Sequence, residues 1–404
     1  MSDTLSRKTL TDLISEQAGG SVVLVRADLN VPLDDDYKLR DATRLMRILP
    51  TLKTLSEAGM KIGIISHFGR PKGQYVAAMS LRPVASALAE LLKKPVSFAE
   101  NCIGEAAQSA LNKLPDGGIC VLENTRFHGG ETANDSDFAK QLAAPAQAFV
   151  SDAFSVAHRA HASNVGIAAY LPSYCGCAMQ AELDALEAAL GNPKHPVVAV
   201  IGGAKISTKI DMLGNLSRKV DVLVIGGGMA NSFLAAQGYE IGKSLCETAM
   251  LETARDILAK AAQNKCQILL PQDVQLAKQF AANQKVTSAP IDAIPPDQMI
   301  LDVGSQSVAA ICATFEAAKT LIWNGPLGAF EIVPFDAATN QTAHYAAQLT
   351  QAGKLISVAG GGDTVAALNH AGIGDDFTYI STAGGAFLEW MEGKKLAGVE
   401  ALMQ

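Results

Sequence analysis

KLISVAGGGDT, residues 354–364, is the stretch around which the chain is organised. Its apolar residues, Leu355, Ile356, Val358 and Ala359, predict a short buried strand. Three glycines follow, and Asp363 and Thr364 then open a predicted helix. Glycine lets a ligand approach the backbone closely, and the unpaired N–H groups at a helix start favour negative charge. The stretch therefore predicts a strand, a turn and a helix start that together bind an anion.

The same pattern recurs in the second half of the chain. It is found in VVAVIGGAK (197–205), VLVIGGGMA (222–230) and ISTAGGAFL (380–388), and more loosely in LIWNGPLGAFE (321–331). One such turn could serve only to allow tight packing of a strand against a helix. Several in one half predict parallel strands whose carboxyl ends converge on a ligand rich in phosphate.

Composition and charge narrow the class of protein. A chain of 404 residues with 49% hydrophobic and 18% charged residues predicts two or three globular domains. The net charge of −7 gives no sign of a nucleic-acid partner or an anionic membrane. Seven scattered cysteines favour reduced thiols in the cytoplasm. The N-terminal sequence lacks the apolar core of a signal peptide, and no apolar run is long enough to span a membrane.

The first half alternates predicted strands and helices, which indicates a second parallel sheet. The strands are predicted at 22–30, 61–70, 119–127 and 148–154. Arginine and histidine, rather than paired glycines, follow their apolar parts: Arg44, His67, Arg70, Arg126, His158, Arg159 and His161. Any one of these could be an ordinary surface charge. Their repeated placement predicts a basic cluster that binds an anionic substrate, because guanidinium groups pair well with carboxylate and phosphate.

A helix of strong helix formers, 178–190, separates the two halves and ends at Gly191-Asn192-Pro193. We interpret it as a connector between domains. Beyond it, Lys205 and Lys209 are four residues apart, which predicts one shared helix face just after a glycine turn. A solvated charged face is the alternative, but the glycines directly upstream favour phosphate binding.

Nine segments together resemble the phosphoglycerate kinase family, over essentially the whole chain. They are VRADLNVPL (25–33), SHFGRPKG (66–73), LENTRFH (122–128), SDAFSVAHRAHAS (151–163), GGAKISTKI (202–210), GGGMANSFL (226–234), WNGPLGAFE (323–331), GGGDT (360–364) and STAGGAFLE (381–389). The resemblance implies an α/β fold of two Rossmann-like lobes, each a parallel sheet flanked by helices. It implies a 3-phosphoglycerate domain (1–178 with 390–404), a hinge helix (179–192) and a nucleotide domain (193–389).

The resemblance also implies the site residues. The family's 3-phosphoglycerate site falls on Asp28, Leu29, Asn30, Arg44, His67, Phe68, Gly69, Arg70, Arg126 and Arg159. Its nucleotide site falls on Lys209, Glu331, Gly361, Gly362, Asp363 and Thr364, with Asp363 close to Mg²⁺. The catalytic groups are Arg44, Lys205, Lys209 and the backbone of Gly384 and Gly385. A monomer is also implied.

The implied reaction transfers a phosphoryl group reversibly between 1,3-bisphosphoglycerate and ADP, giving 3-phosphoglycerate and ATP. The carboxylate that attacks ATP in the reverse direction has a pKa of roughly 3.5, so it is ionised without a general base. Catalysis then depends on positioning and on charge around the transferred group. Because the implied sites lie in separate lobes, the lobes must close about the connector.

Three positions depart from the family pattern: Phe68 replaces a leucine, Ala383 a glycine and Ala397 a proline. Ala383 matters most, because a β-carbon restricts positive φ at a helix start. Two other classes of function fit the sequence less well. A nicotinamide-dependent oxidoreductase needs a G-x-G-x-x-G turn after a strand, which is missing. A non-catalytic nucleotide-binding scaffold is disfavoured because Arg44, Lys205, Lys209 and Asp363 are all present.

Overall fold

The computed structural model describes residues 7–403. Residues 1–6 and 404 lie outside the described residues. The N-terminal sequence predicted not to be a signal peptide begins within residues 1–6. The chain divides into two compact units. The first runs to Leu183 and takes in the chain from Lys395, and the second is Asp184–Lys394. The boundary between the two units, after Leu183, lies within helix α7 (Cys177–Leu186). The role of residues 179–192 as a hinge stays a prediction.

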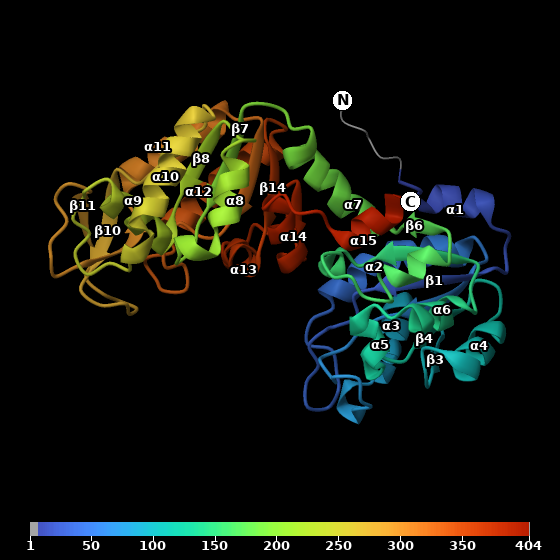
Figure 1. Cartoon of the computed structure of the whole chain (residues 1–404). Coiled ribbons are helices and arrows are strands. Elements are labelled where there is room, and N and C mark those ends of the chain that lie inside the picture. Colours follow the sequence, from blue (N-terminus) through green and yellow to red (C-terminus); the bar gives the residue numbers. More distant parts are fainter. Residues whose placement is uncertain (1–6, 404) are drawn as a thin grey trace. The chain divides into compact units, whose positions relative to one another are not determined.

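The first unit is built on a sheet of six strands in the order β3-β4-β2-β1-β5-β6, and all neighbours are parallel (Figure 1). The strands are β1 (Val22–Ala27), β2 (Lys61–Ile65), β3 (Val96–Ala99), β4 (Ile119–Leu122), β5 (Ala148–Asp152) and β6 (Ser173–Cys175). This order places β4, β2, β1 and β5 side by side, so the chain segments that follow these strands meet at one edge of the sheet.

Helices cover both faces of this sheet, because successive strand residues point to opposite sides. Val23 and Val25 pack with α1 (Leu10–Glu16), α2 (Thr43–Glu57) and α3 (Arg82–Leu92). Val22 and Leu24 pack on the other face with α4 (Gly104–Asn112) and α6 (Ser136–Ala143). The remaining helices of the unit are α5 (Gly129–Ala133) and α15 (Ala397–Glu400).

The second unit repeats this architecture with six parallel strands in the order β15-β14-β13-β7-β8-β9 (Figure 1). The strands are β7 (Val197–Ile201), β8 (Val222–Ile225), β9 (Gln267–Leu269), β13 (Thr320–Asn324), β14 (Ile356–Gly360) and β15 (Tyr379–Ser381). Five neighbouring strands, β15 to β8, are the ones that end in the glycine turns. Parallel pairing therefore brings all five turns to one edge.

One core of the second unit joins the sheet to α11 (Ser305–Ala317), α12 (Ala337–Gln351) and α13 (Gly362–His370). Trp323 and Phe315 lie in it and are buried. The other helices are α8 (Ile210–Leu216), α9 (Gly227–Ala236), α10 (Leu251–Gln263) and α14 (Gly384–Met391). Among these, α8 contacts α10 and α14, and α9 contacts α10.

The predicted fold class, two Rossmann-like units with parallel sheets flanked by helices, is confirmed. A three-stranded antiparallel sheet was not foreseen. In it, β10 (Asp273–Ala277) pairs with β11 (Thr287–Pro290) and β12 (Met299–Val303). Val274, Leu276 and Ile294 form its small core.

Several local predictions differ from the structure. The strands predicted at 22–30, 61–70, 119–127 and 148–154 end earlier, at Ala27, Ile65, Leu122 and Asp152, because the residues that follow form loops and turns. The prediction that Lys205 and Lys209 share a helix face is wrong. Residues Ile206–Thr208 form a 3₁₀ turn, and Lys209 has a φ of −129°, so the α-helix begins only at Ile210. The predicted helix 178–190 is α-helical only to Leu186 and continues as a π-helical turn, Glu187–Gly191.

Two glycine turns of the second unit are in direct backbone contact. The Gly202 amide donates a hydrogen bond of 2.8 Å to the Asn324 carbonyl oxygen. Gly325 has a φ of +98°, and a β-carbon there would meet the backbone of Gly202. The close contact therefore requires glycine at position 325 for conformation and for space.

We expect Gly325→Ala to lower the free energy of unfolding of the second unit by about 2 kcal/mol or more, because it adds backbone strain and a backbone clash. Gly214→Ala is the control, because a β-carbon there meets no atom within 4 Å. Urea unfolding followed by tryptophan fluorescence measures this unit, since Trp323 and Trp390 both belong to it. Equal stability of the two variants would show that the turn tolerates a β-carbon at position 325.

Candidate active site

The first candidate site lies at the edge where β4, β2, β1 and β5 end. The Asp28 carboxylate lies directly after β1 and accepts a hydrogen bond of 2.6 Å from the Ser155 hydroxyl. It also pairs with the Arg44 guanidinium at 3.2 Å. Arg44, in the first turn of α2, donates to the Asn30 carbonyl oxygen at 2.7 Å. The Arg44 side chain is thus held against the segment after β1 while 37% of it stays exposed.

The segment after β2 is tied to the segment after β1. The Gly69 amide donates to the Asn30 side-chain oxygen at 3.0 Å. Gly69 has a φ of +61°. Leu29 is buried, and its amide donates to the Ser66 hydroxyl at 3.0 Å. Phe68 is half-buried, and its amide donates to the Asn124 side-chain oxygen at 3.1 Å.

His67 is buried beside a buried arginine. The Arg26 Nη2 atom lies 3.0 Å from His67 Nδ1, and both side chains are almost fully buried. Burial lowers the pKa of His67 far below its ordinary value, and the charges of Arg26, Arg126 and Arg159 lower it further. The His67 imidazole is therefore neutral at physiological pH.

The remaining arginines of this edge differ in exposure. Arg126 is buried and donates from Nη1 to the Gly69 carbonyl oxygen at 2.7 Å. Its pKa is lowered to about 10 by burial and by the charges of Arg159 and Arg26. Arg159 is half-buried, and its Nε donates to His158 Nε2 at 3.0 Å. Arg70 is exposed.

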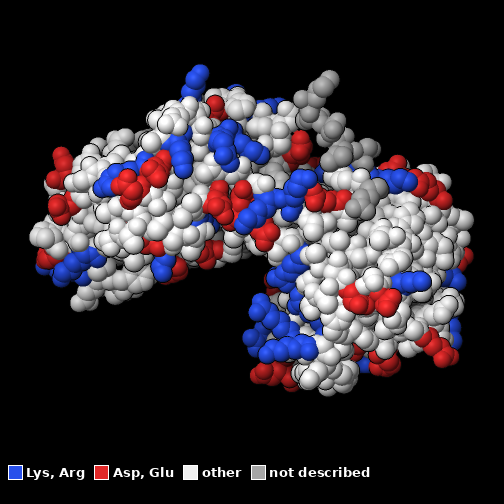
Figure 2. Space-filling view, in the orientation of Figure 1, with Lys and Arg blue, Asp and Glu red and all other residues white. Residues whose placement is uncertain are grey.

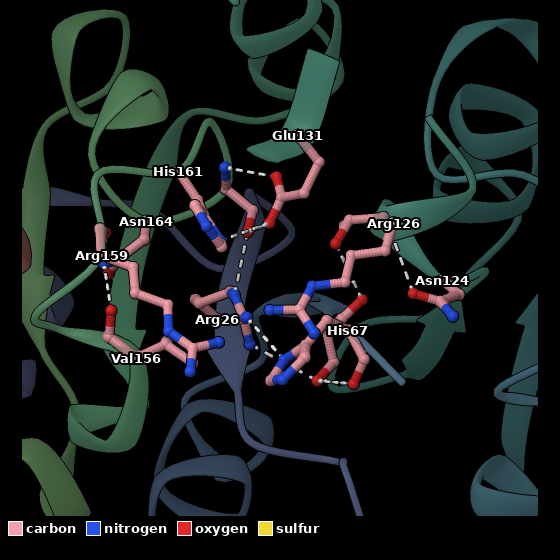
Figure 3. Close-up of polar contacts among 12 residues, drawn as sticks. Arg26, His67, Asn124, Arg126, Glu131, Val156, Arg159, His161 and Asn164 are labelled. Carbon is pink, nitrogen blue, oxygen red and sulfur yellow. Dashed lines mark hydrogen bonds and ion pairs between the residues drawn. The ribbon is translucent and has the colours of Figure 1, made fainter. Parts of the chain in front are cut away.

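Figure 3 shows Arg26, Arg126 and Arg159 around His67 and His161. In Figure 2, Lys and Arg side chains gather along one margin of the first unit. The geometry thus assembles several cationic and hydrogen-bond donor groups at one strand edge, with the exposed Arg70 among them. Such an edge suits a small dianion or an acid that carries both carboxylate and phosphate.

Sequence reasoning missed Arg26, Glu131 and Ser163. Arg26 was assigned only to a strand, although an arginine inside the apolar run VVLVRA must find buried partners. That conflict was the available signal. Glu131 and Ser163 lie far from Arg26 in the sequence and carried no comparable signal.

The second candidate site lies at the glycine edge of the second unit. A cavity of about 280 Å³ is lined by the turns after β7, β13 and β14, together with Lys205, Lys209, Asp363 and Thr364. Lys205 is exposed. The Lys209 ammonium donates to the Asn324 side-chain oxygen at 2.5 Å. Burial lowers the pKa of Lys209, and the carboxylates of Glu392 and Asp363 oppose that effect.

The start of α13 forms one wall of this cavity. Gly361 is its N-cap, with a φ of +97°, and a β-carbon there would meet the Asn324 amide. Thr364 is buried, and its hydroxyl accepts a hydrogen bond of 2.6 Å from the Gly325 amide. Gly362 and Asp363 are exposed in the first turn, where unpaired N–H groups favour an anion.

A second, larger cavity of about 500 Å³ lies beside the 280 Å³ cavity, and Gly203, Ala204 and Asp363 line both. Its walls are mainly apolar, with Leu245, Phe280, Met299 and Leu327 among them, and Glu331 also lines it. A mainly apolar slot with Glu331 among the carboxylates on its wall, joined to a glycine-lined pocket, has the chemistry of a site for a base, a sugar and phosphates.

Ala383 does not strain the turn before α14. It is the N-cap residue with a φ of −94°, which any L-residue adopts, and its amide donates to the Ser381 hydroxyl at 3.2 Å. The expected conflict with a positive φ is therefore absent at this position. Gly384 and Gly385 form the first turn of α14 and are partly exposed, but neither lines the two cavities.

The part of the chain that the structure describes holds no group of three or more His, Cys, Asp or Glu side chains placed to bind a metal. Asp363, which lines both cavities, is the predicted metal-binding carboxylate. A single carboxylate suits Mg²⁺, which commonly binds one or two carboxylates and completes its shell with substrate phosphates and water.

Comparisons with known proteins give one consistent result. The family model described as phosphoglycerate kinase matches residues 12–394. The chain is 59% identical to the phosphoglycerate kinase of Rhizobium meliloti (strain 1021) over 397 residues, which is 98% of this chain and 99% of that protein. It is 57% identical to that of Methylorubrum extorquens (strain PA1), covering 95% and 96% of the two chains. The solved structure of phosphoglycerate kinase from Coxiella burnetii matches with a TM-score of 0.91 at 40% identity, covering 98% and 99%.

We expect Ala383→Gly to lower the free energy of unfolding by about 0.5–1 kcal/mol, because glycine adds freedom to the unfolded chain and relieves no strain. Urea unfolding followed by fluorescence measures the difference. A more stable Ala383→Gly variant would show that the β-carbon strains the turn, contrary to the observed φ.

Proposed function

The chain belongs to the phosphoglycerate kinase family, and we propose that it transfers a phosphoryl group reversibly between 1,3-bisphosphoglycerate and ADP, giving 3-phosphoglycerate and ATP in glycolysis. One observation carries the proposal. A basic strand edge and a glycine-lined pair of cavities occur in a single chain whose likeness to this family extends over nearly its whole length.

The basic edge of the first unit is the proposed 3-phosphoglycerate site. Arg70, Arg126 and Arg159 supply guanidinium groups for the acid's phosphate and carboxylate. His67, neutral and buried, contributes a hydrogen-bond donor rather than a charge. Asp28 and Asn30 orient Arg44, to which both are bonded, or accept from the substrate hydroxyl.

The joined cavities of the second unit are the proposed nucleotide site. The larger, apolar cavity takes the adenine, with Glu331 placed for the ribose hydroxyls. The smaller cavity takes the phosphates against Gly361, Gly362 and Thr364, where α13 begins.

Asp363 would hold Mg²⁺ together with the nucleotide's phosphates. When bound, this ion supplies positive charge that offsets the charge of the phosphate oxygens. The residues fit it, since Asp363 is an exposed carboxylate that lines both parts of the nucleotide cavity.

The transfer needs no general base, because the attacking carboxylate is already ionised. The main obstacle is repulsion between two anions that must meet in line. Lys205, Lys209 and Arg44 reduce it by surrounding the transferred group with positive charge, and the amides of Gly384 and Gly385 add hydrogen-bond donors. Closure about residues 179–192 brings donor to acceptor and excludes water.

The two rival functions are less well supported. No G-x-G-x-x-G turn follows a strand, and the glycine turns belong instead to motifs of the phosphoglycerate kinase family. A non-catalytic scaffold would not need the charged side chains Arg44, Lys205, Lys209 and Asp363, and all four are present. Specific contacts hold some of them, such as the hydrogen bond from Lys209 to Asn324.

We also propose that the protein acts as a cytoplasmic monomer and binds neither nucleic acid nor a membrane. The net charge of −7 supports the proposal that the protein does not bind nucleic acid. Within residues 7–403, none of the helices combines the length and the apolar character required to cross a membrane.

A coupled assay tests the proposed function. The protein receives MgATP and 3-phosphoglycerate, and formation of the acyl phosphate is coupled to an NADH-consuming dehydrogenase. We expect turnover that requires both substrates. Turnover without 3-phosphoglycerate, or none with both, would contradict the proposal.

Lys209→Ala should lower kcat by on the order of 100-fold or more while nucleotide affinity changes little, because its charge is needed most in the transition state. Lys219→Ala, which removes an exposed lysine of the same unit, is the control. Steady-state kinetics and calorimetric titration with ATP measure both quantities. Near-normal turnover of Lys209→Ala would refute its role.

Arg159→Ala should raise KM for 3-phosphoglycerate by about tenfold or more and leave KM for ATP unchanged, because a charged hydrogen bond to the substrate is lost. Arg82→Ala removes an arginine exposed on α3 and serves as the matched variant. The assignment fails if the acid binds the Arg159→Ala protein as tightly as the wild type.

A further inference from the structure

A fully buried carboxylate lies behind the basic edge and plays no part in the proposed transfer. Glu131, in the short helix α5, has no exposed surface. Its Oε1 accepts a hydrogen bond of 2.6 Å from the Ser163 hydroxyl, and its Oε2 accepts one of 2.9 Å from the Ser163 amide. Both oxygens are thus bonded to one residue, and His161 Nδ1 lies 3.8 Å from Oε1.

Glu131 is linked through Ser163 to Arg26 and His67. Figure 3 labels Glu131, Arg26 and His67 in this arrangement. The Ser163 hydroxyl donates its hydrogen bond to Glu131, so a lone pair of the Ser163 oxygen accepts a hydrogen bond of 3.0 Å from Arg26 Nε. Arg26 Nη2 in turn donates to His67 Nδ1 at 3.0 Å. Every hydrogen bond in this buried chain therefore has a fixed direction.

That direction decides the tautomer of His67. A guanidinium group has no acceptor, so the Nδ1 atom that faces Arg26 must be the unprotonated one. The imidazole is neutral because burial and the neighbouring cations lower its pKa. Its single proton must then be on Nε2. His67 is thereby fixed as an Nε2–H donor.

Charge gives Glu131 a second effect on the same groups. Burial lowers the pKa of Arg26, and Glu131 is the first of the charges that oppose this shift. The same carboxylate opposes the lowered pKa of Arg126 and of His161. Glu131 therefore offsets repulsion among cations that surround the site when no anionic substrate is present.

We propose that Glu131 is a positioning residue for 3-phosphoglycerate: through Ser163 it holds Arg26 in place, and Arg26 fixes His67 as the Nε2–H donor to the substrate. The proposal rests on the proposed function for the identity of that substrate. The tautomer of His67 in the free protein does not depend on it.

A purely structural role is the competing explanation. The Glu131 carboxylate also holds the segment after His161, since it accepts hydrogen bonds from both the amide and the hydroxyl of Ser163. If that were its whole role, its replacement would lower stability without changing the tautomer of His67 or the binding of the acid by the folded protein.

Glu131→Gln keeps the size of the side chain but turns one oxygen into an NH₂ group. That group would face the N–H or O–H of Ser163, both of which are donors, so Ser163 must shift. Arg26 Nε then loses its acceptor, while Arg26 Nη1 keeps its hydrogen bond to the Ala27 carbonyl oxygen. We expect KM for 3-phosphoglycerate to rise about tenfold and KM for ATP to change less than about twofold. Glu105→Gln, which removes an exposed carboxylate from the first turn of α4, is the control.

The ¹⁵N NMR spectrum of histidine-labelled protein without ligand gives the second readout, with His67 assigned from a His67→Asn sample. The wild type and Glu105→Gln should show His67 as the Nε2–H tautomer only. Glu131→Gln should show a mixture with the Nδ1–H form. Ser163→Ala, which keeps the Glu131 charge but breaks the link, should shift the tautomer in the same direction and carries the test if Glu131→Gln does not fold.

An unchanged tautomer and an unchanged KM for 3-phosphoglycerate in the folded variants would overturn the proposal, whatever their stability. A shift in both supports it. If the wild type itself shows no turnover of 3-phosphoglycerate, the proposed function fails, and the tautomer in the free variants still decides whether Glu131 positions His67.

Discussion

The parallel pairing of neighbouring strands is the constraint on which the rest of the structure depends. In each unit it brings the carboxyl ends of at least four adjacent strands to one edge. Residues that are far apart in the sequence, such as Asp28 and Ser155, become hydrogen-bonded partners as a result. No single segment could gather these groups, because each strand contributes only the few residues that follow it.

In the proposed function both edges bind negative charge, but with different chemistry. Gly202 and Gly325 allow two backbones to approach each other, and Gly361 leaves room for the Asn324 side chain at the start of α13. The first unit uses arginines, which are larger and must be held in place. Arg26 and Arg126 are buried, so their charge has a desolvation cost that acceptors such as Ser163 and the Gly69 carbonyl oxygen must offset. This cost explains why a carboxylate such as Glu131 lies behind the cationic edge.

The fold class and both edges could be predicted from the sequence, because apolar runs that end in Gly-Gly or in Arg and His repeat with little ambiguity. The contacts could not. The 3₁₀ turn that separates Lys205 from Lys209 and the negative φ of Ala383 depend on neighbours that no local pattern specifies. The antiparallel sheet of β10, β11 and β12 was missed because its core has few residues and therefore gives a weak apolar pattern. The partners of Arg26 were missed because Ser163 is 137 residues away along the chain.

The central claim is that charge fixed at the two strand edges allows a direct transfer, with no general base and no phosphorylated enzyme. The stereochemistry at phosphorus tests it most directly. The protein is given ATP made chiral at the γ-phosphorus with oxygen isotopes, and the configuration of the phosphoryl group on the acid is determined. A single in-line transfer predicts inversion of configuration. Retention would require two successive transfers through a covalent intermediate and would contradict the claim of direct transfer.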